Sequence, residues 1–252
     1  MSSSVQGAQS FSRSMSVLQQ IADANPAPSR AELMRRCGLT RPTLYRVIAS
    51  LEAEGLIETT NDNRYQLGGR LISLARQALA QNDVRKIAEP ALMRLRDDTG
   101  ETVHLAIRSG DELVYIDKME SREVVRMSST IGTRVPFHSS GVGKAFLSAL
   151  PPTEAEQLIG QLTLAQITPF TTTDPAVLQE TVRKARAAGF VRDDQENEAG
   201  IVCFGAAICE GAGRPVASVS VSVPLFRLAE DPSRYSTPLV KAVTEISAQL
   251  GF

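Results

Sequence analysis

The stretch from residue 29 to residue 51 constrains the fold of this chain more than any other. Ser29, with Glu32 three residues later, predicts a capping box at the start of a short helix. A glycine turn follows, and Thr40 with Pro42 predicts the cap and first turn of a second helix. The apolar side chains of the second helix recur three and four residues apart, at Leu44, Val47, Ile48 and Leu51. This spacing predicts a helix–turn–helix.

The flanking sequence completes a small domain around this helix pair. Residues 1–10 are expected to form a disordered tail, and the helix that follows presents one apolar face with Met15, Val17, Leu18 and Ile21. Residues 55–68 read as two short strands around the turn at 61–63. A helix–turn–helix followed by a β-hairpin is the winged form of a DNA-reading unit. Its second helix fits the major groove, and the first residues of that helix reach base edges.

The outer face of the second helix carries side chains that suit nucleic acid. These are Thr40, Arg41, Thr43, Tyr45 and Arg46. Arginine contacts guanine through two hydrogen bonds or binds phosphate, and threonine and tyrosine do either more weakly. We also assign to the DNA-binding surface Ser29 and Arg30, at the start of the first helix, and Arg64, at the expected tip of the hairpin.

The charge of the chain is concentrated in this region. The whole chain holds 27 basic and 28 acidic residues, which gives no overall attraction to nucleic acid. Residues 1–50, however, hold six arginines against Asp23 and Glu32, a local charge of +4. A small basic head on a mildly acidic body indicates a nucleic-acid contact at one end. Two alternatives remain: a small helical bundle with a solvated basic face, and a winged helix that contacts protein.

The sequence period changes after this first domain. Residues 69–99 read as helical, and Asn82 and Asp83 are expected to break them into a linker helix and a second helix. We place the linker at 69–88 and the second domain at 89–252. From Glu101 apolar and polar residues alternate, which predicts a hairpin, and a second apolar hairpin is predicted at 203–224. Further helices are predicted after the glycine-rich turn within 137–150 and over 153–161, 174–188 and 233–250. The second domain is therefore predicted to be α+β with an antiparallel sheet.

Several classes of site and location are disfavoured. The three cysteines, at 37, 203 and 209, lack metal-site spacing, and their odd number fits a reducing cytosol. His104 and His138 show no metal-ligand pattern, so we assign them structural roles. No signal peptide is present, and no apolar run approaches the roughly 18 residues of a membrane span. We therefore expect a cytoplasmic protein without a metal or a cofactor.

Three stretches of the second domain resemble the IclR family of bacterial transcriptional regulators. They are TGETVHLAIRSGDELVYIDKMES at 99–121, IGTRVPFHSSGVGKAFLSALP at 131–151 and GFVRDDQENEAGIVCFGAAI at 189–208. In the last stretch Gly189, Asp193, Glu196 and Cys203 stand at the family spacing. With the weaker likeness of the winged helix, the resemblance covers residues 11–250.

This resemblance implies a domain order and a ligand. It implies a winged helix over 11–68, a linker helix and a GAF-like effector-binding domain over 89–252, in a homodimer or a dimer of dimers. It also implies that a small organic acid binds in the second domain. The pocket would be formed by Ser140, Gly141, Val142, Asp193, Cys203, Ser220 and Ser222, with an apolar wall of Val124, Met127 and Val135.

The chemistry of these residues supports such a pocket. A glycine-rich turn entering a helix presents free N–H groups and the positive end of the helix dipole, which suit a carboxylate. Ser220 and Ser222 point to the same face of a predicted strand. The alternatives are a plain helix cap for the turn and an exposed strand face for the serines. We interpret Cys203 as inert packing and Asp193 as the inward-facing member of an otherwise solvated acidic loop.

Together these observations predict a bacterial transcription factor, more a repressor than an activator. It would bind double-stranded operator DNA under the control of a small organic acid. We do not expect an enzyme, because no arrangement of base and nucleophile can be recognised in the sequence. The alternative is a ligand-sensing or enzymatic module whose winged helix serves protein contacts.

Overall fold

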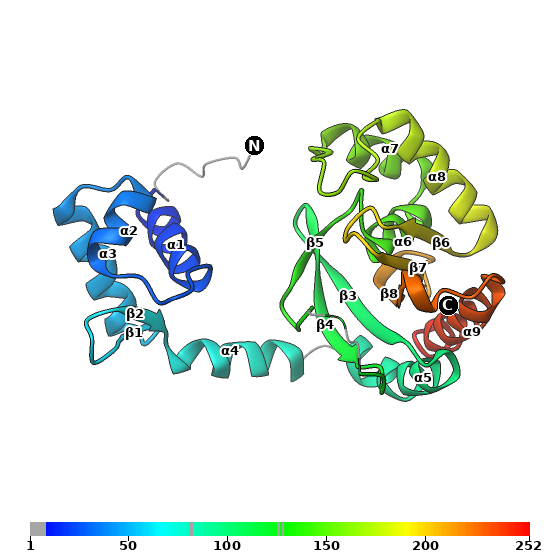
Figure 1. The fold of residues 1–252 in the computed structure, drawn as a ribbon, viewed down its shortest axis with the longest axis horizontal. Helices are drawn as coiled ribbons and strands as arrows, with labels where there is room; N and C mark the ends of the chain where they lie inside the picture. Colours follow the sequence, from blue (N-terminus) through cyan, green and yellow to red (C-terminus); the bar gives the residue numbers. More distant parts are fainter. Residues whose placement is uncertain (1–8, 81–82, 125–126, 128) are drawn as a thin grey trace. The chain divides into compact units, whose positions relative to one another are not determined.

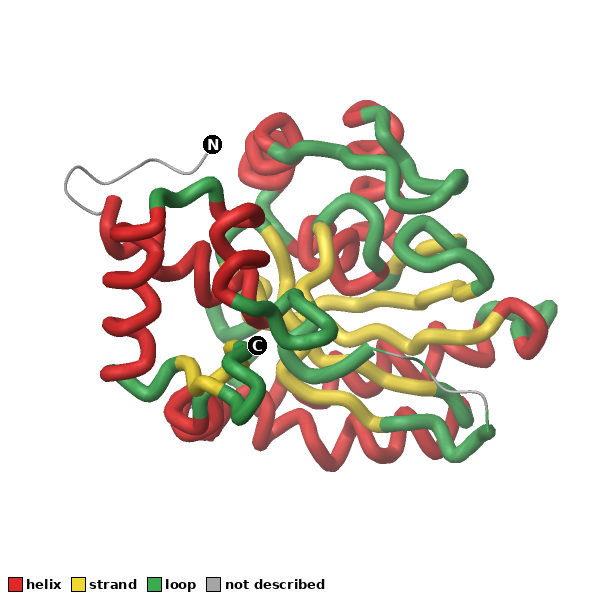
Figure 2. Tube along the Cα trace, turned by 60° about the vertical axis from the view of Figure 1, so that its left-hand side comes forward, coloured by secondary structure: helices red, strands yellow, loops and turns green. Residues whose placement is uncertain are grey.

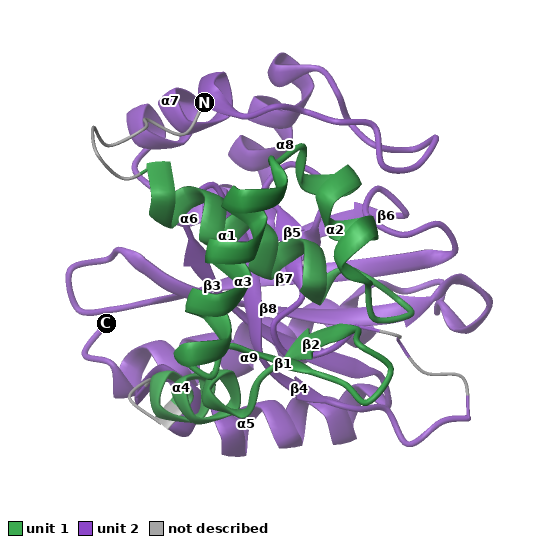
Figure 3. Cartoon of the chain, turned by 90° about the vertical axis from the view of Figure 1, so that its left-hand side faces the viewer, with its two compact units in different colours: residues 1–81 green, residues 82–252 purple. Residues whose placement is uncertain are grey.

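The computed structural model describes residues 9–80, 83–124, 127 and 129–252, and the chain divides into two compact units. The first unit comprises residues 1–81 and the second residues 82–252 (Figure 3). The predicted tail at 1–10 lies outside the described residues except for Gln9 and Ser10. These two are helical, because the backbone hydrogen-bonding pattern of the first helix already begins at Gln9.

The first unit is a helical bundle with a two-stranded wing (Figure 1). Its elements are α1 (Gln9–Ala22), α2 (Arg30–Cys37), α3 (Arg41–Ala53), β1 (Ile57–Thr59), β2 (Tyr65–Leu67) and α4 (Gly69–Ala80). The inner faces of α1, α2, α3 and the wing close over one apolar core, whose largest fully buried members are Tyr65, Leu33, Leu44 and Ile57. The predicted helix–turn–helix and hairpin are both confirmed.

Local signals set the ends of these helices. The Ser29–Glu32 capping box is present: the backbone N–H of Ser29 donates to the Glu32 carboxylate over 2.7 Å, and the Ser29 hydroxyl accepts from the Glu32 N–H. Gly38 ends α2 in the left-handed conformation (φ +60°), where glycine pays no steric penalty. Thr40 stands at the N-cap of α3, but its hydroxyl contacts that of Thr43 (2.9 Å) instead of a backbone N–H.

The second unit is built on a six-stranded antiparallel sheet in the order β5-β4-β3-β8-β7-β6. The strands are β3 (Thr102–Ser109), β4 (Glu112–Met119), β5 (Arg134–Pro136), β6 (Val191–Asp194), β7 (Ile201–Cys209) and β8 (Pro215–Pro224). The two predicted hairpins are confirmed as β3–β4 and β7–β8. The edge strands β5 and β6 were not predicted, because three and four residues are too short to show an alternating pattern.

Helices cover both faces of this sheet (Figure 2). They are α5 (Asp83–Thr99), α6 (Gly141–Ala149), α7 (Pro152–Gln161), α8 (Pro175–Ala188), the 3-10 turn η1 (Leu225–Arg227) and α9 (Ser233–Gln249). Helices α5 and α9 lie on one face, and α6 to α8 lie on the other (Figure 1). The predicted break into two helices is confirmed, since α4 ends at Ala80 and α5 begins at Asp83. The linker boundary at 88 differs from the structure, because residues 83–88 open α5, where Ala88 is buried.

The central strand β8 has no exposed face. Its valines at 219, 221 and 223 and its serines at 218, 220 and 222 are all at most 2 % exposed. Phe204, opposite Val221, stacks on Tyr235 of α9 with 5.2 Å between ring centroids. Gly205, opposite Ser220, touches the start of α6: a Cβ there would lie 2.2 Å from the Gly141 carbonyl oxygen. The valines thus face α9, the serines face α6, and the exposed-face alternative for the serines is excluded.

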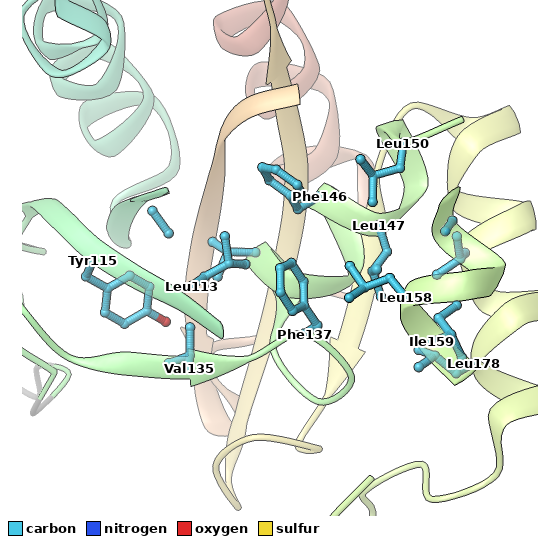
Figure 4. Close-up of a cluster of buried hydrophobic side chains, with 14 residues drawn as sticks. Leu113, Tyr115, Val135, Phe137, Phe146, Leu147, Leu150, Leu158, Ile159 and Leu178 are labelled. Atoms are coloured by element: carbon cyan, nitrogen blue, oxygen red, sulfur yellow. The ribbon is translucent and has the colours of Figure 1, made fainter. Parts of the chain in front are cut away.

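The main apolar cluster of the second unit lies between the sheet and the helices α6, α7 and α8. Figure 4 shows Phe137, Phe146, Leu147, Leu158 and Leu178 filling this space. Tyr115 and Val135 form one end of the cluster, on neighbouring strands. This end carries polar neighbours, which makes it the place to look for a ligand.

Candidate functional site

Helix α3 presents a polar ridge to solvent. Its inner residues Leu44, Val47, Ile48 and Leu51 are buried as predicted. Arg41 and Arg46 are exposed, and the Tyr45 side chain is 38 % exposed. The side chains predicted to contact DNA on this helix are therefore available to a partner.

Tyr45 gathers two arginines from different helices. Arg30, at the start of α2, donates to the Tyr45 hydroxyl over 2.9 Å and lies over its ring with 4.3 Å between guanidinium carbon and ring centroid. Arg41, at the start of α3, donates to the same hydroxyl over 3.3 Å. Arg30 also donates to the hydroxyl of buried Tyr65 on β2 over 2.6 and 2.9 Å. We call Arg30, Tyr45 and Arg41 the tyrosine cluster; it holds two positive charges in a fixed place.

The Arg64 side chain on the wing lies against α2 and the segment before it. Its guanidinium folds back to the carbonyl oxygen of Ala27 (2.6 Å) and to Glu32 (3.4 Å), and it also pairs with Asp62 (3.3 Å). Arg64 stands at the end of the wing turn, directly before β2, as predicted, and its contact with a docked duplex stays a prediction. The unpaired carbonyl before α2 and the acid of its capping box offer the arginine nearer partners, so Arg64 ties the wing to α2.

The second unit contains a small cavity of 140 Å³ at the polar end of its apolar cluster. Its lining residues are His104, Tyr115, Met127, Ser129, Thr133, Val135, Asp193, Asn197, Glu198, Ile201, Cys203 and Ser222. Five of the predicted pocket residues are among them: Met127, Val135, Asp193, Cys203 and Ser222. A larger groove of 480 Å³ lies between α7 and α8, but it is an open surface feature that holds none of the predicted residues.

The other predicted pocket residues lie in different places. The start of α6 adjoins the cavity, because a Cβ on Gly141 would lie 3.0 Å from the Cys203 Cβ and 3.8 Å from the Asp193 Cβ. The Ser140 hydroxyl caps α6 by accepting from the Gly143 N–H (3.0 Å). Ser220 is buried but does not line the cavity. Val124 is 95 % exposed, so its assignment to the apolar wall is wrong; it belongs to a surface turn after β4.

His104 is a lining residue to which we had assigned only a structural role. Its Nδ1 lies 3.3 Å from the Ser222 hydroxyl and its Nε2 lies 2.6 Å from the Ser129 hydroxyl. The ring stacks on Tyr115 with 4.4 Å between centroids. Burial lowers the pKa of His104 to about 3, with a smaller effect from the Lys118 charge. The imidazole is therefore neutral at pH 7, and it can donate one hydrogen bond from one ring nitrogen and accept one at the other.

Cys203 is a half-buried cysteine beside this histidine. Its sulfur donates to the Ser222 hydroxyl over 3.4 Å. Burial raises the pKa of Cys203 well above its ordinary value, and the negative charge of Asp193 adds to that shift. Since the thiolate is the reactive form, this cysteine is held in its unreactive state, in line with our interpretation of it as inert packing.

Asp193 faces the cavity and is 1 % exposed. Burial raises its pKa to about 6, although the Lys144 charge and a 2.8 Å hydrogen bond from the Glu196 N–H pull in the opposite direction. Lys144, fully buried on α6, forms an ion pair with Glu196. The sequence analysis missed the lysine, although one charged residue inside the apolar run GVGKAFL was a signal of a buried partner.

The described residues contain no group of three or more His, Cys, Asp or Glu placed to hold a metal ion. Within the same ranges, no helix is long and apolar enough to cross a membrane.

Two protein-family models match the chain. The model for the bacterial transcriptional regulator IclR C-terminal domain matches residues 76–248, and the model for the IclR helix-turn-helix domain matches residues 10–60. The chain belongs to the IclR family of bacterial transcriptional regulators. It is 32 % identical over 247 residues to the HTH-type transcriptional repressor AllR of Escherichia coli K12. The matched region covers 97 % of this chain and 91 % of that protein.

Solved structures of the IclR family agree with both units. The Thermotoga maritima IclR structure matches with a TM-score of 0.76 at 33 % identity, covering 96 % of this chain and 98 % of that one. An IclR homologue from Microbacterium hydrocarbonoxydans, solved with 4-hydroxybenzoate, matches with a TM-score of 0.79 at 25 % identity, covering 96 % and 98 %. This IclR-family chain is a DNA-binding transcriptional regulator, with a winged helix followed by an effector-binding α+β domain.

Proposed function

We propose that this regulator is a cytoplasmic repressor that binds operator DNA as a dimer or a dimer of dimers. A small organic acid bound in the 140 Å³ cavity sets its affinity for DNA. The observation that carries the proposal is the lining of that cavity. Apolar Val135 and Met127 meet several polar groups there, and the start of α6 adjoins the cavity through Gly141. The cavity lies in the domain type that binds effectors in this family.

We assign a role to each part of the ligand. The acid carboxylate approaches the first turn of α6, where the N–H groups of residues 141 and 142 have no partner within the helix. Ser222 and neutral His104 complete the polar contacts, and Val135 with Met127 limits the size of the apolar remainder. The 4-hydroxybenzoate held by the Microbacterium homologue is of this chemical class, an acid with a polar group at its far end.

Control of DNA binding requires that the acid prefer one state of the protein. A ligand with equal affinity for the DNA-binding and released states shifts nothing, however tightly it binds. A coupling free energy of about 1–3 kcal/mol, or roughly 5–150-fold in DNA affinity, is ordinary for such regulators.

The assignment is tested by a thermal-shift screen of keto, hydroxy and aromatic acids, followed by titration of the best ligand. Ser222→Ala removes a hydroxyl that lines the cavity, and Ser220→Ala removes one from the same strand face that does not. We expect the first variant to bind the acid at least tenfold more weakly and the second to bind as the wild type does. An acid that regulates DNA binding yet keeps its affinity for Ser222→Ala would place the pocket elsewhere.

Assembly follows from the demands of operator recognition. One winged helix reads too few base pairs to select a site in a genome, and two-fold related copies solve this by reading two half-sites. Helix α4 leaves Ile72 75 % and Leu74 47 % exposed, and these two side chains, about 200° apart around the helix axis, offer apolar contacts to a second copy on two sides of α4. We expect dimers or larger assemblies at micromolar concentration and a near-palindromic site. Sedimentation of a monomer that still binds operator tightly would refute this.

A further inference from the structure

A groove of 240 Å³ lies between α1 and α3 of the first unit. Helix α1 contributes Ser10, Arg13 and Ser14 to its walls, and α3 contributes Thr43, Arg46 and Ser50. We call this the α1–α3 groove. Two guanidinium groups and four hydroxyls line it, and no acidic side chain is among the described residues that do so. Only Thr43 and Arg46 were assigned to DNA binding from the sequence, so α1 adds a basic side chain that the assigned contacts leave out.

The groove and the tyrosine cluster flank the outer ridge of α3 on opposite sides. Arg41 and Tyr45 stand one turn apart, and so do Arg46 and Ser50. Since each residue turns an α-helix by about 100°, the two pairs are about 140° apart around the helix axis. The first pair meets Arg30 of α2, and the second meets Arg13 of α1. A positive charge from a neighbouring helix therefore stands on each side of the recognition helix.

The dimensions of the DNA major groove place both flanks of α3 beside the sugar–phosphate backbone. The major groove is about 12 Å wide. An α-helix with its side chains is about 10–12 Å across. A helix seated there has its outer ridge toward the bases and its two flanks toward the sugar–phosphate walls. The two walls belong to opposite strands.

We propose that the α1–α3 groove holds a phosphate of one DNA strand while the tyrosine cluster holds a phosphate of the other. This inference rests on the proposed operator binding and adds α1 to the interface. Arg13 and Arg46 supply the charge. The hydroxyls of Ser14 and Ser50 donate to carbonyls one turn back in their own helices, and the Thr43 hydroxyl contacts Thr40. Arg13 forms no ion pair with any acid of the described residues, so its charge is available to a phosphate.

Salt dependence tests the contribution of Arg13. Each phosphate contact on B-DNA adds about 0.9 to the slope of log affinity against log salt. Arg13→Ala should therefore lower that slope by about 0.9, which is about eightfold weaker binding at 0.1 M salt if the curves meet at 1 M. The loss should be equal on matched and scrambled fragments. Arg13→Gln should behave alike, and Arg183→Ala, an equal change of charge on exposed α8, should change neither slope nor affinity.

Strand assignment is tested by ethylation interference on operator fragments selected from genomic DNA. Within one half-site, Arg13→Ala should remove interference at phosphates of one strand, and Arg30→Ala at phosphates of the other. Loss on the same strand for both variants, or an unchanged salt slope for Arg13→Ala and Arg13→Gln, would overturn the proposal while operator binding stands. If the wild-type full chain does not distinguish matched from scrambled fragments, operator binding fails, and this inference fails with it.

Discussion

The arginines of the first unit lie on its surface, whereas the ionisable groups around the cavity of the second unit lie in its interior. Arg41 and Arg46 remain solvated until a partner approaches, so their charge costs the fold little. Lys144 and Asp193 are each 1 % exposed, and a buried charge needs a partner or must give up its charge. DNA binding by the surface therefore depends on the number and placement of charges, whereas the stability of the interior depends on ion pairing and protonation.

The largest effect should come from breaking the buried ion pair. Lys144→Met leaves Glu196 and Asp193 without their cation inside the protein, so the free energy of unfolding at pH 7 should fall by about 3–5 kcal/mol. Urea denaturation measures this loss. The exposed pair of Arg183 with Glu180 is the matched control, and Arg183→Ala should leave the urea midpoint close to that of the wild type.

Adding Glu196→Gln to Lys144→Met should restore part of the lost stability, since one of the two uncompensated carboxylates is then neutral. If Lys144→Met costs no more than Arg183→Ala, the contrast between buried and exposed charge fails for this protein.

The next effect concerns the surface arginines. Arg41→Ala and Arg46→Ala should each weaken operator binding by about 1–3 kcal/mol. Neither should change the free energy of unfolding by more than about 0.5 kcal/mol, because both side chains are exposed. An arginine that reads a base relaxes preference at one position, whereas one that binds phosphate weakens every sequence alike. We expect the second pattern for both, because Tyr45 holds Arg41 and Arg46 lines the α1–α3 groove. Gel shifts on matched and scrambled sites decide, and wild-type affinity in both variants would remove α3 from the interface.

Protonation of Asp193 should make effector binding depend on pH. Its pKa of about 6 lies above the ordinary value of 3.8 because burial disfavours the charged form. An ionised effector carboxylate is repelled by ionised Asp193 and tolerated by the protonated form. Affinity should therefore be highest below about pH 6 and fall by up to about tenfold per unit as the pH rises above it. Calorimetric titrations from pH 5 to 8 would show this.

Asp193→Asn is the control for this pH dependence and should remove it. The same substitution tests stability. Between pH 3.8 and about 6 the unfolded chain releases a proton that the folded chain keeps, so wild-type stability falls as the pH rises through this window. The Asn variant should lose less stability there. If Asp193→Asn keeps the wild-type pH dependence of effector binding, that dependence belongs to another titratable group.

The smallest effect should come from Tyr45→Phe, which removes a hydroxyl and keeps the ring under Arg30. The two arginines lose a shared acceptor but remain charged, so operator binding should weaken by only a few-fold, about the effect of one ordinary hydrogen bond. Tyr45→Leu, which also removes the ring, should weaken it further. Fluorescence anisotropy on the selected operator can resolve the difference. Equal binding by wild type and Tyr45→Phe would show that the hydroxyl does not position the arginines.

The sequence by itself determined the local features of both units. The capping box at Ser29, the left-handed turn at Gly38 and the apolar spacing of α3 depend on residues within one or two turns of each other. Alternation of apolar and polar residues predicted the β3–β4 hairpin, and an apolar run predicted the β7–β8 hairpin. The inward orientation of Asp193 was also predicted, but the residue lies in β6 and not in a loop, and the alternation of that strand turns Asp193 inward and Asp194 outward.

Only the tertiary structure decided which long side chains meet. Arg64 could have extended to DNA, but packing of the wing on α2 places Glu32 nearer. His104 and Ser222, which are 118 residues apart, become neighbours only when β3 and β8 pair. Lys144 finds Glu196 in the same way, across α6 and the loop after β6. A local pattern specifies conformation because neighbours in sequence interact in any compact state. The partner of a long polar side chain depends on which distant segments fold against it.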